Sequence, residues 1–313
     1  MRILCLGAGA IGGYFGGRLV EGGTNVEFLV RDHRKAKIAR DGLRIESKYG
    51  NCHLKVRAVT ADEAKGPFDL ILLTCKAYDL PDAIATISPF VGSGTAVLPL
   101  LNGVAHMELL NGRFGRDRVL GGVAKIAATL SPEGIIRHLN DWRFITFGEQ
   151  NGEITTRVQD LKAAFDKTSV IAAAVPNIMQ TIWEKVVHLS TVAGMTCAMR
   201  ASVGEIARTQ DGSTLMIRLL ERNAEIAGYE GYPPSDTFMT EYRKLLNDTS
   251  STYTASMLRD IERGGPIEAD HILGFMLNKA RQHRIDASLH QFIFVHLQSY
   301  EQRRAALQAR AAA

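Results

Sequence analysis

The chain has 313 residues, and its 37 Lys and Arg against 33 Asp and Glu give a formal net charge of +4. Hydrophobic residues make up 46% and charged residues 22% of the chain, which is typical of folded globular proteins and excludes a disordered chain. The small charge excess argues against nucleic acid or an anionic membrane as the main partner. At about 100 to 200 residues per domain, this length predicts two domains.

The four cysteines predict a reducing compartment and no metal site. Cys5, Cys52, Cys75 and Cys197 lie far apart, so neither a disulfide framework nor a Cys-x-x-Cys zinc site is indicated. The sequence also lacks a His-Glu-x-x-His pattern, and we expect no metal. Glycines interrupt the apolar N-terminus before it reaches the ~18 residues of a membrane span. We therefore expect a cytoplasmic protein that does not enter a membrane.

Continuous apolar runs in the first half predict parallel strands that are covered on both faces. A segment of helical length separates the first two runs, so the chain begins as strand, helix, strand. The four runs lie at residues 2–6, 25–30, 69–76 and 95–103.

Residues 43–60 alternate polar and apolar side chains around Tyr49-Gly50-Asn51, which predicts an antiparallel hairpin. Further strands are expected within residues 119–130 and 141–149. We therefore predict an α/β fold in which residues 1–175 form a Rossmann-type doubly wound sheet.

The second half predicts an all-helical domain over residues 176–313, for substrate binding or dimerisation. Its apolar residues recur with helical spacing, and Gly204, Gly231 to Pro234 and Gly264 to Pro266 supply turn signals. The C-terminal tail, residues 303–313, is expected to fray. The helical segments are residues 177–199, 213–228, 236–262 and 267–283.

A glycine-rich turn follows the first strand directly. Residues Gly7-Ala8-Gly9-Ala10-Ile11-Gly12 match G-x-G-x-x-G. The first glycine permits a tight turn, the second lets a pyrophosphate approach the backbone, and the third lets the helix approach the strand. The helix N-terminus then offers amide donors to an anion. Its place between a first strand and a helix predicts a dinucleotide site rather than an incidental turn.

The end of the second strand favours NADP over NAD. An NAD site usually has an acidic residue there that binds the ribose hydroxyls. In this chain Arg31 precedes Asp32, and His33, Arg34, Lys35 and Lys37 follow. A guanidinium offers a planar, permanently charged donor fork that suits the 2′-phosphate of NADP. The alternative is a solvated, basic start of a helix.

Lys76 and Asn102-Gly103 each follow a predicted parallel strand. Ligands bind in the crevice beyond the carboxyl ends of such strands, so these residues are candidates for the cofactor site. They also suit ordinary loops.

Seven features stand in chain order, namely GAGAIG at 7–12, Arg31, TCKAYD around Lys76, LLNG ending in Asn102-Gly103, WEK at 183–185, SMLRDIERG at 256–264 and IEADHILG at 267–274. Together they resemble the ketopantoate reductase (2-dehydropantoate 2-reductase) family over nearly the whole chain. The resemblance implies a Rossmann-type domain, a helical C-terminal domain, and NADPH-dependent reduction of a 2-keto acid in pantothenate synthesis.

The resemblance also implies roles for individual residues. The proton-donating lysine falls on Lys185, which would also contact the substrate. Lys76 and Asn102 correspond to cofactor contacts, and Asn102 to a substrate contact as well. Ser256 corresponds to a substrate-binding serine, and Glu268 to a catalytic glutamate near nicotinamide and substrate.

Three positions depart from the family pattern. Family members usually carry asparagines where this chain has Leu189, Ala193 and Val203. The loss of these side-chain amides makes the substrate pocket less polar, and bears on the substrate more than on the reaction.

The residues themselves are compatible with this chemistry. Ketone reduction requires a proton donor within hydrogen-bond reach of the carbonyl oxygen, and an ammonium also stabilises a developing oxyanion. On a helical wheel Lys185 lies between the polar face of Gln180, Glu184 and His188 and an apolar face. It therefore also suits a lysine whose stem covers a core helix.

The other candidate residues have structural interpretations as well. Glu268 and Asp270 suit the first turn of a helix, where acids complement the dipole, and we take Asp270 as structural. Ser256 within a helix suits a bond to its own backbone. His188 is expected to be solvated, and Trp183 to lie in the core.

Three functions therefore remain open. The first is NADPH-dependent reduction of ketopantoate to pantoate, and the second is reduction of a more apolar 2-keto acid. The third is a non-catalytic NADP(H)-binding redox sensor, against which the retention of Lys185 and Glu268 argues. The sequence leaves stereochemistry and oligomeric state open, with a homodimer formed through helical domains as one expectation.

Overall fold

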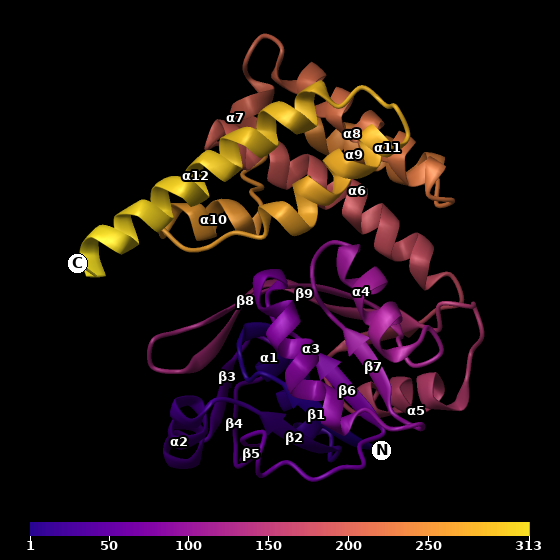
Figure 1. Cartoon of the computed structure of the whole chain (residues 1–313), viewed down its shortest axis with the longest axis vertical. Coiled ribbons are helices and arrows are strands. Elements are labelled where there is room, and N and C mark those ends of the chain that lie inside the picture. Colours follow the sequence, from indigo (N-terminus) through magenta and orange to yellow (C-terminus); the bar gives the residue numbers. More distant parts are fainter. Residues whose placement is uncertain (313) are drawn as a thin grey trace. The chain divides into compact units, whose positions relative to one another are not determined.

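The computed structural model describes residues 1–312 and consists of two compact units (Figure 1). The first unit contains residues 1–101 and 106–179, and the second contains residues 102–105 and the chain from Gln180 onward. The first unit is α/β and the second is helical. The predicted fold class is therefore confirmed.

The first unit is built on a sheet of five parallel strands. The order is β5-β2-β1-β6-β7, so the direction of winding changes between β1 and β6, where open α/β sheets bind ligands. All pairings are parallel, as the continuous apolar runs predict. The strands are β1 (Arg2–Leu6), β2 (Asn25–Leu29), β5 (Arg57–Val59), β6 (Leu70–Leu73) and β7 (Ala96–Pro99).

A second sheet completes this unit, in the order β10-β9-β3-β4 with β8 paired to β9. The strands β3 and β4 form the predicted antiparallel hairpin. The predicted extent of that hairpin is wrong at its end, because Arg57–Val59 pairs in parallel with β2 in the first sheet. The strands are β3 (Leu43–Glu46), β4 (Cys52–Leu54), β8 (Gly121–Leu130), β9 (Ile135–Gly148) and β10 (Ile171–Ala174).

The helix α1 (Ala10–Glu21) lies between the two sheets, and its glycines permit the close approach on both sides. A Cβ on Gly16 would lie 2.8 Å from the ring of Phe28 in β2. A Cβ on Gly13 would lie 2.4 Å from Ile136 in β9. The same helix therefore packs on both sheets, and a side chain at either position would force Phe28 or Ile136 to shift. The other α-helices of this part of the chain are α2 (Asp32–Asp41), α3 (Leu80–Ile87), α4 (Ala105–Phe114) and α5 (Thr156–Phe165).

The second unit confirms the helical prediction and corrects several boundaries. The predicted helix 236–262 is two helices, because the chain leaves the helix after Leu246 and returns to it only at Ser256. The segment 267–283 begins with a π-helical turn. The tail that is expected to fray is helical through Ala312, and its last residue lies outside the described residues. The elements are α6 (Ile178–Met199), α7 (Val203–Ala207), α8 (Gly212–Tyr229), α9 (Asp236–Leu246), α10 (Ser256–Glu262), the π-helical turn η3 (Asp270–Gly274), α11 (Phe275–Gln282) and α12 (Ser288–Ala312).

The longest helix is α12, coloured yellow in Figure 1, with 25 residues. Its apolar residues do not extend over enough consecutive positions for a transmembrane span. Within residues 1–312, no helix combines the length and the apolar character that crossing a membrane requires.

Candidate active site

The glycine-rich turn connects β1 to α1, and each of its three glycines has a different environment. Gly7 has a φ of +93°, which favours glycine. A Cβ on Gly12 would lie 2.3 Å from Oγ1 of Thr74 and 2.4 Å from the carbonyl oxygen of Gly7. A Cβ on Gly9 would meet no atom of the described residues within 4 Å. A dinucleotide site requires a tight turn, a close contact between helix and strand, and free space beside the backbone for the pyrophosphate. Gly7, Gly12 and Gly9, respectively, meet these three requirements.

The start of α1 fits an anionic group. Gly9 is the N-cap, and within residues 1–312 no side chain caps this helix end and no acid occupies its first turn. The first amides of a helix have no partner within the helix, and they carry a partial positive charge. Together with the open space at Gly9, these donors fit the pyrophosphate of a dinucleotide.

Arg34 holds the glycine-rich turn, a role that the sequence analysis missed. Its guanidinium donates to the carbonyl oxygen of Ala8 at 2.8 Å from one nitrogen and 3.2 Å from another. The same group reaches the carbonyl oxygen of Gly134 at 3.5 Å. Burial lowers the pKa of Arg34, but a guanidinium remains charged. Arg34 contacts residues 8 and 134, which are far from it in the sequence. The pattern of residues around Arg34 therefore does not predict these contacts.

Arg31 and Asp32 lie at the start of α2, where Arg31 is the N-cap and Asp32 the first helical residue. Both side chains are exposed. Lys76 lies two residues after Thr74, beyond β6, and its carbonyl begins the short 3-10 turn of Ala77–Asp79. The glycine turn, Arg31 and Lys76 therefore all lie in the first unit, where they follow β1, β2 and β6.

Lys185 lies in α6, on a stretch that aromatic contacts fix within the second unit. Trp183 is 3% exposed. Its ring stacks on Tyr232 at a centroid distance of 6.1 Å and contacts Phe275 of α11 at the same distance. Trp183 is therefore a core residue, as predicted, and it holds this turn of α6 against α11. Lys185 itself is half-buried.

Two side chains of the polar face of α6 bind the segment that precedes α9. Gln180 donates to the carbonyl oxygen of Pro233 at 2.9 Å, and Glu184 accepts from the backbone N–H of Ser235 at 3.0 Å. These side chains therefore fasten α6 to the turn before α9.

The prediction that His188 is solvated is wrong. Its ring stacks on Tyr242 with centroids 4.3 Å apart, and its Nε2 lies 3.2 Å from the hydroxyl of Tyr253. Burial raises the pKa of Tyr242 to about 12, so this phenol stays neutral. The sequence pattern missed these contacts because α9 and residue 253 are remote from α6 in sequence.

Ser256 is the first residue of α10 rather than an interior helical residue, which corrects the expected placement. The segment before it runs along α6. Tyr253 contacts His188, and the backbone N–H of Ala255 donates to Oγ1 of Thr196 at 3.5 Å. The structure therefore places Ser256 next to a segment that packs on the part of α6 that follows Lys185.

Glu268 and His271 form a cluster with the segment that follows β7. Glu268 is 7% exposed. Gly103 has a φ of +87°, and a Cβ there would lie 2.8 Å from Cδ2 of His271. Burial lowers the pKa of His271, while Glu268 and a hydrogen bond with the backbone of Asn102 raise it. The imidazole is therefore neutral at neutral pH, and it fixes Asn102-Gly103 beside the segment of Glu268.

His271 is not among the candidate residues that the sequence pattern indicated. Its signal was weak, because a histidine beside an acid in a helical pattern usually lies on the surface. The π-helical turn Asp270–Gly274 is a feature that often marks functional sites. Asp270 is exposed at the start of this turn, in keeping with its structural interpretation.

The three positions that depart from the family pattern differ in their environment. Ala193 and Val203 are both 0% exposed, and Leu189 is half-buried. The backbone N–H of Val203 donates to the carbonyl oxygen of Tyr253 at 3.0 Å. Of these three residues, Leu189 is therefore the one whose side chain is partly exposed to solvent.

The two buried cysteines, Cys5 and Cys197, do not supply thiolate chemistry at neutral pH. Burial raises the pKa of Cys5 and of Cys197 to about 12, so both remain neutral thiols. In the part of the chain that the structure describes, no group of three or more His, Cys, Asp and Glu is arranged to hold a metal ion.

Comparison with known proteins identifies the family. Residues 3–152 match the family described as "Ketopantoate reductase PanE/ApbA", and residues 177–301 match "Ketopantoate reductase PanE/ApbA C terminal". The protein "Uncharacterized oxidoreductase YkpB" of Bacillus subtilis is 34% identical over 96% of this chain and 99% of its own. A 2-dehydropantoate 2-reductase of Mesorhizobium japonicum is 28% identical over 87% of this chain and 89% of its own.

Solved structures agree with this assignment. The 2-dehydropantoate 2-reductase of Methylococcus capsulatus is 25% identical, with a TM-score of 0.87 over 97% of this chain and 98% of its own. A D-mandelate dehydrogenase, solved with NADH and anilino(oxo)acetate, shares the fold at 20% identity, with a TM-score of 0.85 over 97% of this chain and 100% of its own. Both halves of the sequence and the whole fold thus lead to one conclusion, that this chain belongs to the ketopantoate reductase family.

Proposed function

We propose that this oxidoreductase reduces 2-dehydropantoate (ketopantoate) to pantoate with NADPH. The observation that carries the proposal lies within the second unit, where Lys185 follows Trp183 in α6, and Trp183 contacts Phe275, seven residues after Glu268 in the chain. The first unit adds a glycine turn whose open backbone fits a dinucleotide. The family match and the relatives named 2-dehydropantoate 2-reductase support the choice of substrate.

Each proposed residue has a role in this reaction. Bound NADPH supplies the hydride for the carbonyl carbon of the substrate. Lys185 donates the proton to the carbonyl oxygen, and its positive charge stabilises the negative charge that develops there. Glu268 acts beside it as the second catalytic group.

The remaining proposed residues bind the cofactor and the substrate. Asn102 and Ser256 bind the substrate, and His271 positions Asn102. Residues 7–12 and Lys76 hold the cofactor with Asn102 and Glu268, and Arg31 binds its 2′-phosphate.

A panel of 2-keto acids assayed by the loss of NADPH absorbance tests the substrate. Ketopantoate is expected to give the highest kcat/KM, with ketoisovalerate as the apolar comparison. A panel in which no 2-keto acid is turned over would contradict the proposal.

Replacing Arg31 with alanine is expected to remove most of the preference for NADPH. A charged hydrogen bond contributes about 1.5 to 3 kcal/mol, so kcat/KM with NADPH should fall by about 10- to 100-fold while kcat/KM with NADH changes little. Arg40→Ala, at the other end of α2, is the control for the loss of charge. Equal kcat/KM for both cofactors in the unaltered protein would overturn the assignment.

A second candidate substrate is a more apolar 2-keto acid, which Leu189 favours. Its half-buried side chain offers no hydrogen bond to a hydroxyl. The shared fold of D-mandelate dehydrogenase is compatible with such a substrate but is no evidence for it, because fold alone does not set specificity.

Leu189→Asn is expected to lower KM for ketopantoate relative to ketoisovalerate by about tenfold, since a regained hydrogen bond contributes roughly 1 to 3 kcal/mol. The single change is preferred over one that includes Ala193, because a larger side chain at that fully buried position would overpack the core. Leu245→Asn, a half-buried leucine in α9, controls for general destabilisation. If both acids respond alike to Leu189→Asn, this position does not contact the substrate.

A further inference from the structure

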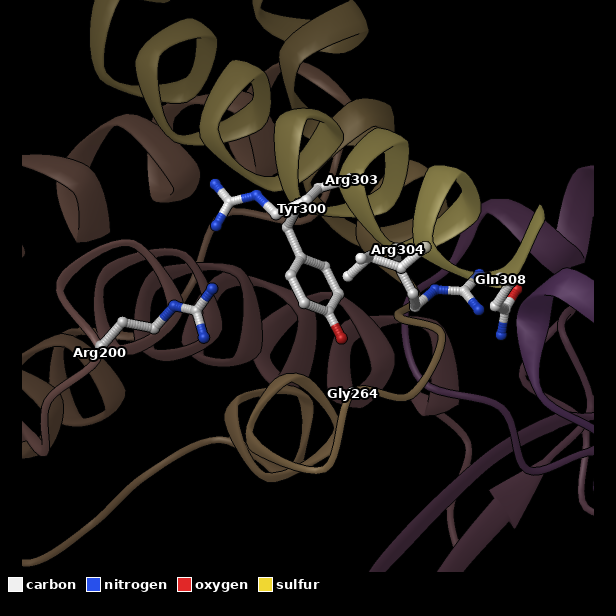
Figure 2. Close-up of a pocket in the computed structure, with 7 residues that line it drawn as sticks. Arg200, Gly264, Tyr300, Arg303, Arg304 and Gln308 are labelled. Atoms are coloured by element: carbon white, nitrogen blue, oxygen red, sulfur yellow. The ribbon is translucent and has the colours of Figure 1, made fainter. Parts of the chain in front are cut away.

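A cavity of about 430 Å³ lies in the second unit beside α12 (Figure 2). It belongs to neither proposed part of the active site. Among the described residues, those that line it include three arginines and no carboxylate. They are Arg200, Gly264, Tyr300, Arg303, Arg304, Leu307 and Gln308.

Arg200 occupies a backbone position that normally requires glycine. It follows the C-terminus of α6 with a φ of +54°, and the next residue donates back to Thr196 to close the helix. Side chains are disfavoured in this left-handed conformation, and glycine is the usual residue at such a helix end. The guanidinium carbon lies 5.5 Å from the centroid of the Tyr300 ring. The strained backbone thus carries a cation to the edge of the cavity, an arrangement that often marks a functional residue.

Hydrogen bonds fix the wall of the cavity. The hydroxyl of Tyr300 donates to the carbonyl oxygen of Gly265 at 2.8 Å. Arg304 binds Oε2 of Glu301 through two nitrogens, each at 2.8 Å. Glu301 in turn accepts from the backbone N–H of Ile267 at 2.7 Å through its other oxygen. Tyr300 is therefore held in place before any ligand arrives, which lowers the entropy cost of binding. Arg304 is held by an ion pair with which an anionic ligand competes.

The charge balance of the cavity is positive. Two carboxylates, those of Glu301 and Asp260, act on the hydroxyl of Tyr300. Burial raises the pKa of Tyr300, Glu301 and Asp260 raise it further, and Arg304 and Arg200 oppose this. Glu301 is already bound by Arg304 and Ile267. Arg200 and Arg303 are both exposed, and Figure 2 shows their guanidinium groups on the same side of the Tyr300 ring, with Arg304 and Gln308 on the other.

We propose that this cavity binds a small phosphorylated anion. The guanidinium fork of arginine matches the geometry of phosphate oxygens and stays charged at all relevant pH values. Arg200, Arg303 and Arg304 contact the phosphate oxygens, and the ring of Tyr300 forms one wall. The volume lies within the usual range for small-molecule sites, about 300 to 1,000 Å³.

Binding at this cavity also reaches the proposed active site. A phosphate that binds Arg304 weakens the ion pair between Arg304 and Glu301. The Glu301 carboxylate also accepts the backbone N–H of Ile267, so its position changes with that ion pair. Ile267 is the residue next to Glu268. This part of the inference rests on the proposed function, since it assumes that Glu268 acts in catalysis. It predicts that the anion changes kcat for the 2-keto acid.

Isothermal titration of the full chain with inorganic pyrophosphate tests the site, with Arg200→Gly as the decisive variant. This change removes the guanidinium group and introduces glycine, which adopts the positive φ of this position without strain. The melting temperature should therefore stay the same or rise. The dissociation constant is expected to increase by about tenfold or more, because a charged hydrogen bond is lost.

Arg284→Gly is the matched control. Arg284 has a φ of +58° at the end of α11 and is exposed. Replacing it with glycine therefore removes the same charge and adds the same backbone freedom as Arg200→Gly, but outside the cavity. Arg284→Gly should leave the dissociation constant unchanged. Absence of pyrophosphate binding, or equal weakening by both variants, would overturn the site.

Arg31→Ala separates this cavity from the proposed 2′-phosphate contact. Pyrophosphate binding that is lost in Arg31→Ala and kept in Arg200→Gly would place the anion at the cofactor site and overturn the proposal. Because binding is measured without turnover, a protein that reduces no 2-keto acid leaves this test intact. If pyrophosphate binds and kcat is unchanged, the link to Glu268 is wrong.

Discussion

Lys185→Ala is expected to lower kcat by about 10²- to 10⁴-fold, the usual contribution of a positioned general acid. The ammonium acts on the carbonyl oxygen as negative charge develops there, so its removal affects the transition state more than the bound substrate. The dissociation constant for NADPH should therefore change little, as should KM for the 2-keto acid. Steady-state kinetics together with titration of the cofactor measure the two effects separately.

Two controls accompany this variant. Lys244→Ala removes an exposed lysine from α9 and should leave kcat unchanged. Thermal unfolding of Lys185→Ala shows whether α6 remains packed through Trp183, whose contacts with Tyr232 and Phe275 the change does not touch. If Lys185→Ala keeps kcat within a few-fold of the unaltered protein, another group donates the proton.

Gly9→Ala and Gly12→Ala are expected to fail in different ways, although both lie in the same turn. A methyl group on Gly9 meets no described atom within 4 Å, so the free energy of unfolding should change by no more than about 1 kcal/mol. The same methyl group occupies the space through which the pyrophosphate approaches the backbone. The dissociation constant for NADPH should therefore rise by about tenfold or more, which corresponds to ~1.4 kcal/mol.

Gly12→Ala should instead destabilise the fold. Its Cβ would lie 2.4 Å from the carbonyl oxygen of Gly7, and backbone atoms do not yield as the end of a flexible side chain does. Overpacking of this kind costs about 1 to 3 kcal/mol, and occasionally more. Denaturant unfolding and cofactor titration of both variants distinguish the two failures.

Gly112→Ala provides the reference for a glycine change in open space. Its Cβ meets no described atom within 4 Å, and alanine is favoured over glycine inside a helix such as α4. This variant should be slightly more stable and bind NADPH normally. Normal NADPH binding by Gly9→Ala would contradict the assignment of the turn as the pyrophosphate site.

The sequence by itself determined the parts of this protein that depend on local patterns. Continuous apolar runs predicted the parallel strands β6 and β7, because strands buried on both faces consist mostly of apolar side chains. Shorter apolar runs on either side of a helix-length segment predicted β1 and β2 as strands. Helical spacing predicted most of the second unit. The G-x-G-x-x-G spacing predicted the turn between β1 and α1, since the conformation of Gly7 and the contact of Gly12 depend on residue type at fixed positions.

The tertiary structure decided what depends on partners remote in the sequence. The same pattern of apolar residues suits a helix that covers one sheet, and only the fold shows that α1 lies between two, with Gly13 against β9 and Gly16 against β2. The end of the predicted hairpin became β5 because β2 offered a free edge.

The site follows the same division. Helical periodicity places Gln180, Glu184 and His188 on one face, but it carries no information about the residues that pack there. The fold brings Pro233, Ser235 and Tyr253 to that face. Polar side chains that could equally face solvent therefore form hydrogen bonds between α6 and other segments of the second unit. The contact of Gly103 with His271 joins residues 168 positions apart. Such contacts depend on how separate segments pack together. The sequence of one segment is compatible with several packing partners, so it does not specify which one buries its residues.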